Sequence, residues 1–365
     1  MGFNCGIVGL PNVGKSTLFN ALTAAAADAA NYPFCTIEPN VGRVLVPDLR
    51  LDEIAVLAGS ATVTPTSLEF IDVAGLVRGA SAGEGLGNQF LGHIRGVEAI
   101  AHVVRCFGGS EISHNDGTVD PVADVQIVEA ELMLADLESL ERRRDVITKK
   151  ERRGDKDARA LLDVIGVAEA SLAEGCPVRS ISPDLPTSHL LASLELLSAK
   201  PVMYVCNVDE GAMIDGNSYS RTLQVYADSR NAACVVTSAR IEAEIAAIEE
   251  ASERSAFLKT LGLEGSGLAH VISAGYSLLG LVTFFTAGPK EARARTLRRG
   301  SSAVEAAAKV HSDFARGFIR AETISYGDYI SLGGEAGARE AGRLRQEGRD
   351  YLVDDGDVIL FRFNV

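Results

Sequence analysis

The sequence predicts an α/β fold: a parallel sheet with helices, interrupted by a helical hairpin and followed by a small C-terminal module of strands. Three observations predict it. A glycine-rich loop near the N-terminus stands between a strand-like and a helix-like segment. Apolar residues recur at helical spacing over residues 124–175. From Leu281 onward the pattern changes to short strands. At 365 residues the chain exceeds one typical hydrophobic core, so several domains are expected.

The glycine-rich loop is Gly9-Leu10-Pro11-Asn12-Val13-Gly14-Lys15-Ser16, which fits G-x-x-x-x-G-K-S/T. The segment before it, Cys5–Val8, is apolar like a buried strand, and Ser16–Leu22 has the pattern of a helix, whose N-terminus favours an anion. Backbone N–H groups of such a loop cradle phosphate oxygens, the lysine places its charge on the outer phosphates, and the serine hydroxyl can ligate Mg²⁺. The sequence therefore predicts a nucleotide-binding protein whose phosphates lie on Asn12, Val13, Gly14, Lys15, Ser16 and Thr17.

Composition narrows the class of protein. Apolar residues make up 47% of the chain, enough for a core, and a run of about 18 uninterrupted apolar residues, as a membrane span would need, does not occur. Six cysteines without a C-x-x-C pair indicate reduced thiols in a cytoplasmic protein, with neither a zinc site nor a disulfide framework. The net charge of −14 argues against wholesale coating of nucleic acid and leaves room for local basic patches.

Two further residues are predicted to hold Mg²⁺. Ser67–Ile71 has the pattern of a strand, and it delivers Asp72-Val73-Ala74-Gly75 at its carboxyl end. A D-x-x-G after a strand, downstream of the phosphate loop, is the order that switch-type NTPases use, and its aspartate supports Mg²⁺ through water. In the polar, proline-punctuated loop before that strand, Thr36 is available as a second hydroxyl. We therefore expect Mg²⁺ on Ser16 and Thr36, supported by Asp72.

The residues alone do not identify a single catalytic group. Small GTPases carry a glutamine after D-x-x-G to orient the attacking water, whereas this chain has Leu76, which makes no hydrogen bond, so hydrolysis needs another group. His102 lies inside the apolar strand Glu98–Phe107 and is expected to be a core histidine. His114 lies in the polar loop after that strand. Because strand carboxyl ends face the ligand in α/β sheets, His114 is either a solvated loop residue or a group that reaches the phosphates.

The base pocket is predicted from a second strand end. Pro201–Cys206 has the pattern of a strand and is followed by Asn207-Val208-Asp209-Glu210, where a GTPase would have N-K-x-D. Without the lysine and the final aspartate the grip on guanine is compromised, and main-chain groups near Val208 can read adenine. A further strand from Cys234 ends in the position of the usual base-backing loop. We therefore predict ATP rather than GTP, with adenine beside Asn207, Val208 and Glu210 and backed by Ser238 and Ala239.

Two long amphipathic helices are predicted between Asp124 and Gly175, meeting at Gly154 in an antiparallel hairpin. Its tip is charged, with Lys149, Lys150, Arg152 and Arg153 close together. This run is either a solvated face or a projecting arm that touches RNA or a protein partner.

The C-terminal region has the pattern of closing helices over residues 249–281 and then of a small β-grasp-like module. We expect strands at Leu281–Phe285, Ala292–Leu297 and Ala321–Ser325, a helix from Ser301 to Phe314 opened by a capping box of Ser302 and Glu305, and a terminal hairpin of Tyr351–Val353 and Val358–Phe363 around Asp355-Gly356. Basic residues from Lys290 to Arg299 predict a patch that faces RNA or the ribosome.

A set of strings carries a family resemblance: the phosphate loop, Phe34-Cys35-Thr36-Ile37-Glu38-Pro39-Asn40, Asp72-Val73-Ala74-Gly75-Leu76, Gly83-Glu84-Gly85-Leu86-Gly87-Asn88-Gln89-Phe90, Asn207-Val208-Asp209-Glu210, and Asp313-Phe314-Ala315-Arg316-Gly317-Phe318-Ile319-Arg320-Ala321-Glu322. Together they resemble the Obg-like ATPase (YchF) family over essentially the whole chain. The resemblance implies a P-loop NTPase domain of Obg type (1–123 and 199–280), an inserted helical coiled-coil hairpin (124–198) and a C-terminal β-grasp TGS domain (281–365).

The resemblance also implies an activity. Members of this family are translation-factor-class NTPases that prefer ATP, hydrolyse it slowly, associate with ribosomes and are linked to stress responses. Where the usual glutamine is hydrophobic, as at Leu76, a histidine in a flexible loop is the catalytic group, and His114 matches that position. The asparagine of the phosphate loop, Asn12, implies that K⁺ assists. We thus predict a cytoplasmic, ATP-dependent switch on the ribosome, with no membrane partner and a monomer favoured.

Two other functions stay open at this point. One is an Obg-type GTPase proper, which would bind guanine nucleotides more tightly. The other is an RNA-binding or chaperone-like regulator in which the nucleotide is a structural co-ligand. Cys35, in the predicted switch loop, is either an oxidation-sensing thiol or a buried one.

Overall fold

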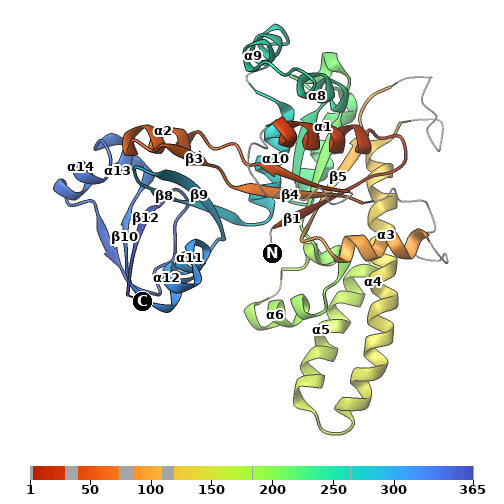
Figure 1. The fold of residues 1–365 in the computed structure, drawn as a ribbon. Coiled ribbons are helices and arrows are strands. Elements are labelled where there is room, and N and C mark those ends of the chain that lie inside the picture. Colours follow the sequence, from red (N-terminus) through yellow and green to blue (C-terminus); the bar gives the residue numbers. More distant parts are fainter. Residues whose placement is uncertain are drawn as a thin grey trace. The chain divides into compact units, whose positions relative to one another are not determined.

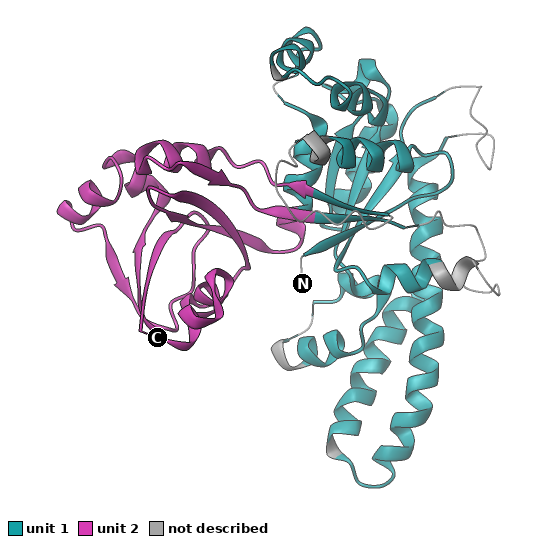
Figure 2. Ribbon diagram, viewed as in Figure 1, with its two compact units in different colours: residues 1–43, 69–275 teal, residues 44–68, 276–365 magenta. Residues whose placement is uncertain are grey.

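The computed structural model describes residues 3–28, 40–73, 86–108, 119–182, 184–263 and 265–364. The chain divides into two compact units, shown in Figure 2: unit 1 comprises residues 1–43 and 69–275, and unit 2 comprises residues 44–68 and 276–365. Within the described ranges, no helix is both long enough and apolar enough to cross a membrane.

Unit 1 is built on a six-stranded sheet in the order β2-β4-β1-β5-β6-β7. Its strands are β1 (Asn4–Val8), β2 (Val41–Leu45), β4 (Ser67–Asp72), β5 (Ala99–Arg105), β6 (Val202–Asn207) and β7 (Ala233–Thr237). The pairs of β1 with β4, β1 with β5, β5 with β6 and β6 with β7 are all parallel. Strands β5 and β6 are buried along their whole length, as expected of continuous apolar runs in the middle of a parallel sheet. The strands predicted in this region are confirmed.

Helices surround this sheet, as Figure 1 shows. They are α1 (Lys15–Asp28), α3 (Leu86–Arg95), α7 (Ser218–Ser229), α8 (Ala239–Ala246), α9 (Ala251–Thr260) and α10 (Gly267–Leu278), with short 3₁₀ turns η1 (Val178–Ser180), η2 (Leu197–Ala199) and η3 (Glu210–Ala212). Because parallel strands need a crossover between them, each helix that links two strands returns the chain to the same edge of the sheet. The carboxyl ends of β1, β4, β5, β6 and β7 therefore lie along one edge.

The predicted helical hairpin is confirmed. It consists of α4 (Pro121–Glu151) and α5 (Lys156–Ala173), which pack side by side (Figure 1) and are followed by α6 (Leu185–Ser193). The Asp120 side chain caps α4 by accepting hydrogen bonds from two backbone N–H groups. The turn uses Gly154 at φ +87°, a left-handed conformation that glycine adopts without steric cost. An apolar cluster that includes Leu140, Ile165 and Leu194 fills the space between these helices.

A buried polar cluster lies where the hairpin meets the sheet. The Glu129 carboxylate of α4 pairs with the Arg179 guanidinium and accepts hydrogen bonds from the Tyr204 hydroxyl at 2.7 Å and the Tyr226 hydroxyl at 2.9 Å. Burial by itself would raise the pKa of Glu129, but the Arg179 charge and the two hydroxyl donors hold that pKa below its ordinary value. Glu129 is therefore an ionised, fully partnered anchor for the base of α4.

Unit 2 has its own six-stranded sheet, in the order β11-β10-β12-β8-β9-β3. The strands are β3 (Thr62–Thr64), β8 (Leu281–Ala287), β9 (Glu291–Arg298), β10 (Phe318–Ile324), β11 (Arg345–Glu347) and β12 (Val358–Phe363), and the helices are α2 (Leu49–Ala58), α11 (Ala303–Val310), α12 (Ser312–Arg316), α13 (Tyr326–Ser331) and α14 (Glu335–Glu340). The sheet is mixed, since β8 pairs antiparallel with β9 but parallel with β12.

The two faces of this second sheet bury separate cores. Phe284 and Phe285 are neighbours on β8, so their side chains point to opposite faces. Phe284 packs in a cluster with residues of α11, and Phe285 packs in a cluster with residues of α2, α13 and α14. Residues 44–68, which the predicted boundaries assign to the first domain, lie in unit 2 because α2 covers one face and β3 pairs in parallel with β9. The assignment of unit 2 as a TGS domain stays a prediction.

The helix predicted from Ser301 to Phe314 is wrong in one respect, because the structure has two helices there. The capping box of Ser302 and Glu305 is present and opens α11. His311 then adopts an extended backbone, with φ −163° and ψ 148°, and its Nδ1 accepts a hydrogen bond from the Asp313 N–H. His311 thus ends the first helix and caps the second.

The predicted terminal hairpin is also wrong. Strand β12 pairs with β10 and β8, and residues 351–353 make only an isolated bridge between Leu352 and Ser302. The turn that should have joined the two strands binds β8 instead, since Gly356 donates to the Thr283 carbonyl and the Asp355 side chain accepts from the Thr283 N–H at 2.8 Å. The chain before that turn is therefore drawn toward the start of α11.

Candidate nucleotide-binding site

The phosphate-loop pattern lies between β1 and α1, as predicted. Asn12 has φ +64° and Gly14 has φ +91°, so the backbone turns tightly there and reaches α1 at Lys15. A Cβ on Gly14 would lie 2.2 Å from the Asn207 amide nitrogen. Glycine is therefore required at this position both by the backbone conformation and by the close approach of β6.

The structure brings two of the predicted chemical groups into contact. The Lys15 ammonium forms an ion pair with the Asp72 carboxylate, although the two residues are 57 positions apart in the sequence. The contact follows from the topology, because β1 and β4 are parallel neighbours whose carboxyl ends lie at the same edge. Ser16 is the next residue of α1 and lines the same cavity as Lys15.

Asn207 joins the phosphate loop to the segment that is predicted to back the base. Its side-chain NH₂ donates to the Val13 carbonyl at 2.9 Å, and its side-chain oxygen accepts from the Ala239 N–H at 2.9 Å. Both polar atoms of this amide are thus engaged by the protein. Val208, the next residue, is only 2% exposed, and its N–H donates to the Thr237 carbonyl. Asn207 therefore shapes the pocket by holding three chain segments together.

A cavity of about 820 Å³ opens over these elements, a size that suits a nucleotide. Most of the predicted binding residues line it, namely Asn12, Gly14, Lys15, Ser16, Thr17, Asn207, Val208, Glu210, Ser238 and Ala239. Val13 does not line the cavity; its side chain is buried. Five lining residues have no place in the predicted site: Leu10, Pro11, Phe107, Asp209 and Arg240.

Some predicted groups lie outside the described residues. These are Thr36, Cys35, Leu76 and His114. Their predicted roles in metal binding, oxidation and catalysis stay predictions.

Phe107 is the lining residue for which the sequence offered a usable signal. It follows the buried strand β5, and loops after strand carboxyl ends face the ligand in α/β sheets. The Arg105 guanidinium lies 4.8 Å from the centre of the Phe107 ring, and its Nε donates to the Phe107 carbonyl at 3.2 Å. Arg105 is itself only 2% exposed. One wall of the cavity is thus an aromatic ring backed by a buried cation.

His102 is a core histidine, as predicted. It lies on β5 and is 2% exposed, with its ring centre 6.0 Å from that of Tyr204. Burial lowers the pKa of His102 to about 4, although the nearby charge of Glu129 opposes that shift. The ring is therefore neutral at physiological pH.

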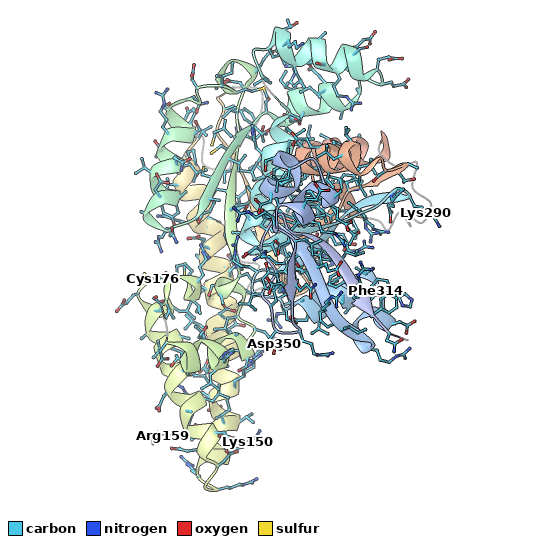
Figure 3. All side chains as sticks on the ribbon, turned by 90° about the vertical axis from the view of Figure 1, so that its left-hand side faces the viewer. Lys150, Arg159, Cys176, Lys290, Phe314 and Asp350 are labelled. Atoms are coloured by element: carbon cyan, nitrogen blue, oxygen red, sulfur yellow. The ribbon has the colours of Figure 1, made fainter. Side chains whose placement is uncertain are left out.

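The two predicted basic patches differ in their surroundings. At the hairpin tip Lys149, Lys150, Arg152 and Arg153 are all exposed, and Figure 3 shows Lys150 and Arg159 near the end of the hairpin. On β9, Arg293 is exposed and lies 3.7 Å from the Glu291 carboxylate. Arg295 is half-buried, and burial together with the Arg293 charge lowers its pKa to about 10. The two patches thus differ at Arg295, which is half-buried, whereas the four basic residues of the tip are all exposed.

Comparison with known proteins gives consistent matches. A family model described as a 50S ribosome-binding GTPase matches residues 4–134, and the model YchF-GTPase_C, described as a protein of unknown function, matches residues 281–364. The Ribosome-binding ATPase YchF of Haemophilus ducreyi is 52% identical over 365 residues, which is 100% of both chains. The protein of the same name from Bacillus subtilis is 50% identical over 367 residues, again 100% of both chains. The solved structure of the Schizosaccharomyces pombe YchF GTPase has a TM-score of 0.90 at 34% identity, covering 99% of this chain and 98% of that one.

Proposed function

The chain belongs to the YchF family, and from this premise we propose that it is a Mg²⁺-dependent ATPase that hydrolyses ATP slowly and acts as a nucleotide switch on the ribosome. The observation that carries the proposal is the cavity of about 820 Å³ in unit 1, which is lined both by phosphate-loop residues and by the residues predicted to bind the base. The names of the bacterial relatives, which describe ribosome-binding ATPases, support the same activity.

The phosphates lie on the main-chain N–H groups of the loop from Asn12 to Thr17, at the N-terminus of α1. Two features favour an anion there: the N–H groups that a helix leaves without intrahelical partners in its first turn, and the charge of Lys15. Lys15 exchanges its contact with Asp72 for the outer phosphates when the nucleotide binds. Catalysis then consists mainly of positioning and charge stabilisation.

Adenine lies beside Val208 and Glu210, backed by Ser238 and Ala239. The side chain of Val208 is buried and apolar, so it cannot lie over a base as a lysine stem would. The amide of Asn207 is engaged by Val13 and Ala239, so its part in base recognition is to hold the pocket in shape. Main-chain groups around Val208 are left to read the edge of the base, which suits adenine.

The residues of this site fit Mg²⁺. The Ser16 hydroxyl and the Asp72 carboxylate are hard oxygen donors, which Mg²⁺ prefers, and the contact of Asp72 with Lys15 shows that this carboxylate reaches the phosphate loop. Bound Mg²⁺ would neutralise charge on the phosphates. We assign Ser16 and Thr36 as ligands, with Asp72 acting through water. We include K⁺ as an assisting ion beside Asn12, which lines the cavity.

His114 is our proposed catalytic group. The support for it is the family resemblance together with Leu76, which stands where a water-orienting glutamine would be. The imidazole would orient or deprotonate the attacking water.

The partner we propose is the ribosome. The chain binds it as a monomer in the cytoplasm, and this interaction takes part in stress responses. Two observations support RNA contact: the exposed basic residues from Lys149 to Arg153 at the hairpin tip, and the basic residues from Arg293 to Arg299 that begin on β9. Positive charge concentrated on an acidic protein is the usual footprint of nucleic-acid binding.

Calorimetric titration with ADP, an ATP analogue, GDP and a GTP analogue, each with Mg²⁺, tests the base assignment. We expect adenine nucleotides to bind at least tenfold more tightly than guanine nucleotides. The variant Lys15→Ala serves as the control, because it removes the phosphate contact and should weaken all four ligands together. Preference for guanine would instead favour a GTPase, which is how the Schizosaccharomyces pombe relative is described, and would contradict our assignment of Val208 and Glu210.

A further inference from the structure

The end of β5 occupies a central place in the site. β5 lies between β1, which leads into the phosphate loop, and β6, which leads into the base-side wall. The chain leaves β5 at Arg105 and reaches Phe107, which lines the cavity. The contacts that hold residues 105–107 in position therefore also set the position of a wall between the phosphate side and the base side of the pocket.

Hydrogen bonds from three sources hold this short segment. The Cys106 N–H donates to the Asn207 carbonyl at 2.8 Å. The Cys106 carbonyl accepts from the side-chain NH₂ of Asn217 at 2.6 Å. The Arg105 Nε donates to the Phe107 carbonyl at 3.2 Å. The first bond continues the pairing of β5 with β6 by one residue, and the third comes from the segment itself. Asn217 supplies a side-chain contact from a different element.

Asn217 performs two separable tasks with its one side chain. Its oxygen caps α7 by accepting a hydrogen bond from the Ser220 N–H at 3.0 Å, while the Ser220 hydroxyl accepts from the Asn217 N–H at 2.9 Å to complete a capping box. Its nitrogen reaches away from the helix to Cys106. Aspartate or serine would cap the helix as well as asparagine does, but an ionised aspartate has no donor, and serine has one shorter hydroxyl in place of the separate acceptor and NH₂ donor of the amide. The capping task alone does not require an asparagine here.

We propose that Asn217 is a positioning residue for nucleotide binding: by holding the Cys106 carbonyl, it sets the Phe107 ring as a wall of the pocket. The inference rests on the proposed function of this cavity. Asn217 does not line the cavity, so it acts through Cys106 and Phe107. The Arg105 guanidinium also contacts the Phe107 ring, 4.8 Å from the ring centre.

The energetic reason is the burial of the segment. Cys106 is fully buried, so a backbone carbonyl that loses its donor there must find another or shift. The shift is passed on to the next residue, Phe107, whose ring then no longer keeps its place against Arg105 as a wall of the cavity. The fold as a whole keeps its sheet bonds, so the loss should appear in ligand affinity more than in stability.

The test measures the dissociation constant of a fluorescent ATP analogue and the thermal midpoint for four variants. Asn217→Ser keeps the helix cap and removes the amide NH₂ that reaches Cys106, and we expect the dissociation constant to rise about tenfold, equivalent to ~1.4 kcal/mol. Asn217→Asp keeps the shape and the cap, and should raise it at least as much. Ser220→Ala breaks the capping box and leaves the donor in place, so it should lower the thermal midpoint without changing affinity. Phe107→Ala removes the ring.

The decisive comparison combines Asn217→Ser with Phe107→Ala. Once the ring is absent, loss of the amide should raise the dissociation constant less than about twofold further. Multiplicative effects of the two changes would overturn the proposal, and so would an equal rise in Ser220→Ala, which would trace the effect to helix capping. Wild-type protein that binds no nucleotide would contradict the proposed function and this inference with it, whereas normal affinity in Asn217→Ser would contradict this inference alone.

Discussion

The two ends of the helical hairpin are both rich in charged residues, yet the structure uses them in opposite ways. At the base, Glu129 is 5% exposed and is satisfied by one guanidinium and two hydroxyls. Asp136, further along α4, is 2% exposed and accepts from the Leu197 and Ser198 N–H groups. At the tip, the basic residues from Lys149 to Arg153 face solvent. The same hairpin thus carries structural charges at one end and solvated charges at the other.

The role of a charged residue therefore cannot be predicted from its residue type alone. A buried charge must be partnered, and removing its partner is costly because the remaining group stays desolvated. An exposed charge contributes little to stability, because water and salt screen it. We therefore expect variants at the base to lose mainly stability and variants at the tip to lose mainly partner binding, when both quantities are measured on the same variants.

The largest expected effect is at the base. Arg179→Met leaves the Glu129 carboxylate buried without its cation, and we expect the free energy of unfolding to fall by about 3–5 kcal/mol. Urea denaturation followed by circular dichroism measures it. Adding Glu129→Gln to Arg179→Met removes the unpaired charge and should recover part of the loss. A loss below about 1 kcal/mol in the single variant would mean that the pair is not the anchor that its burial indicates.

The next effect depends on pH and concerns His102, beside the same cluster. Its pKa in the folded protein is about 4, against an ordinary value of 6.5. Between these values the unfolded chain takes up a proton at this position and the folded protein does not, so stability that is present above pH 6.5 is lost as the pH falls toward 4. The difference amounts to about 3 kcal/mol. Below pH 4 this residue adds no further dependence.

Unfolding by urea at several pH values between about 7 and 4 checks this in the wild type and in His102→Asn. The carboxylates titrate in both proteins, so the quantity of interest is the difference between the two curves. We expect that difference to shrink as the pH falls, because only the wild type has a histidine to protonate. Parallel curves would show that His102 binds a proton equally well in both states.

The smallest effect on stability is expected at the tip. Reversing two exposed charges, Lys150→Glu with Arg153→Glu, should shift the thermal midpoint by less than about 2 °C. The same variant should co-sediment with ribosomes less well than the wild type, and its binding should depend less steeply on salt, because fewer counterions are released. The matched control reverses Arg221 and Lys259, two exposed basic residues on α7 and α9. Equal loss in both variants would point to net charge rather than to the hairpin tip.

Much of the site could be predicted from the sequence because its parts are local. The phosphate loop is a continuous run whose glycines and lysine are required by backbone geometry and phosphate charge, and the structure gives it the expected strand and helix. Asp72 was also predictable, because its motif follows a strand and strand order implies which ends meet. The metal and catalytic assignments of Thr36 and His114 stay predictions, since both lie outside the described residues.

Other features depend on contacts between distant segments. Asn217 lies 111 residues from Cys106, its hydrogen-bond partner, and no local pattern marks the pair. The terminal hairpin was mispredicted because Asp355 and Gly356 look like an ordinary hairpin turn, whereas they bind β8. Residues 44–68 received no predicted element before Ser67, although Asp48 and Gly59 are present as caps of α2. A single helix is predicted across His311, whereas the extended backbone of His311 and its side-chain cap on the Asp313 N–H divide the segment into two helices.

Local sequence is enough to predict the class of fold, the phosphate loop and the family, since these depend on local backbone requirements and on strings of contiguous residues. Tertiary contacts decide the rest: which charges are anchors and which are solvated, why Asn207 must be an asparagine, and which groups contact the segment of Cys106 and Phe107. The physical reason is that burial and hydrogen-bond partnership are properties of the packed chain: whether Glu129 or Lys150 is exposed depends on what the rest of the fold brings against it.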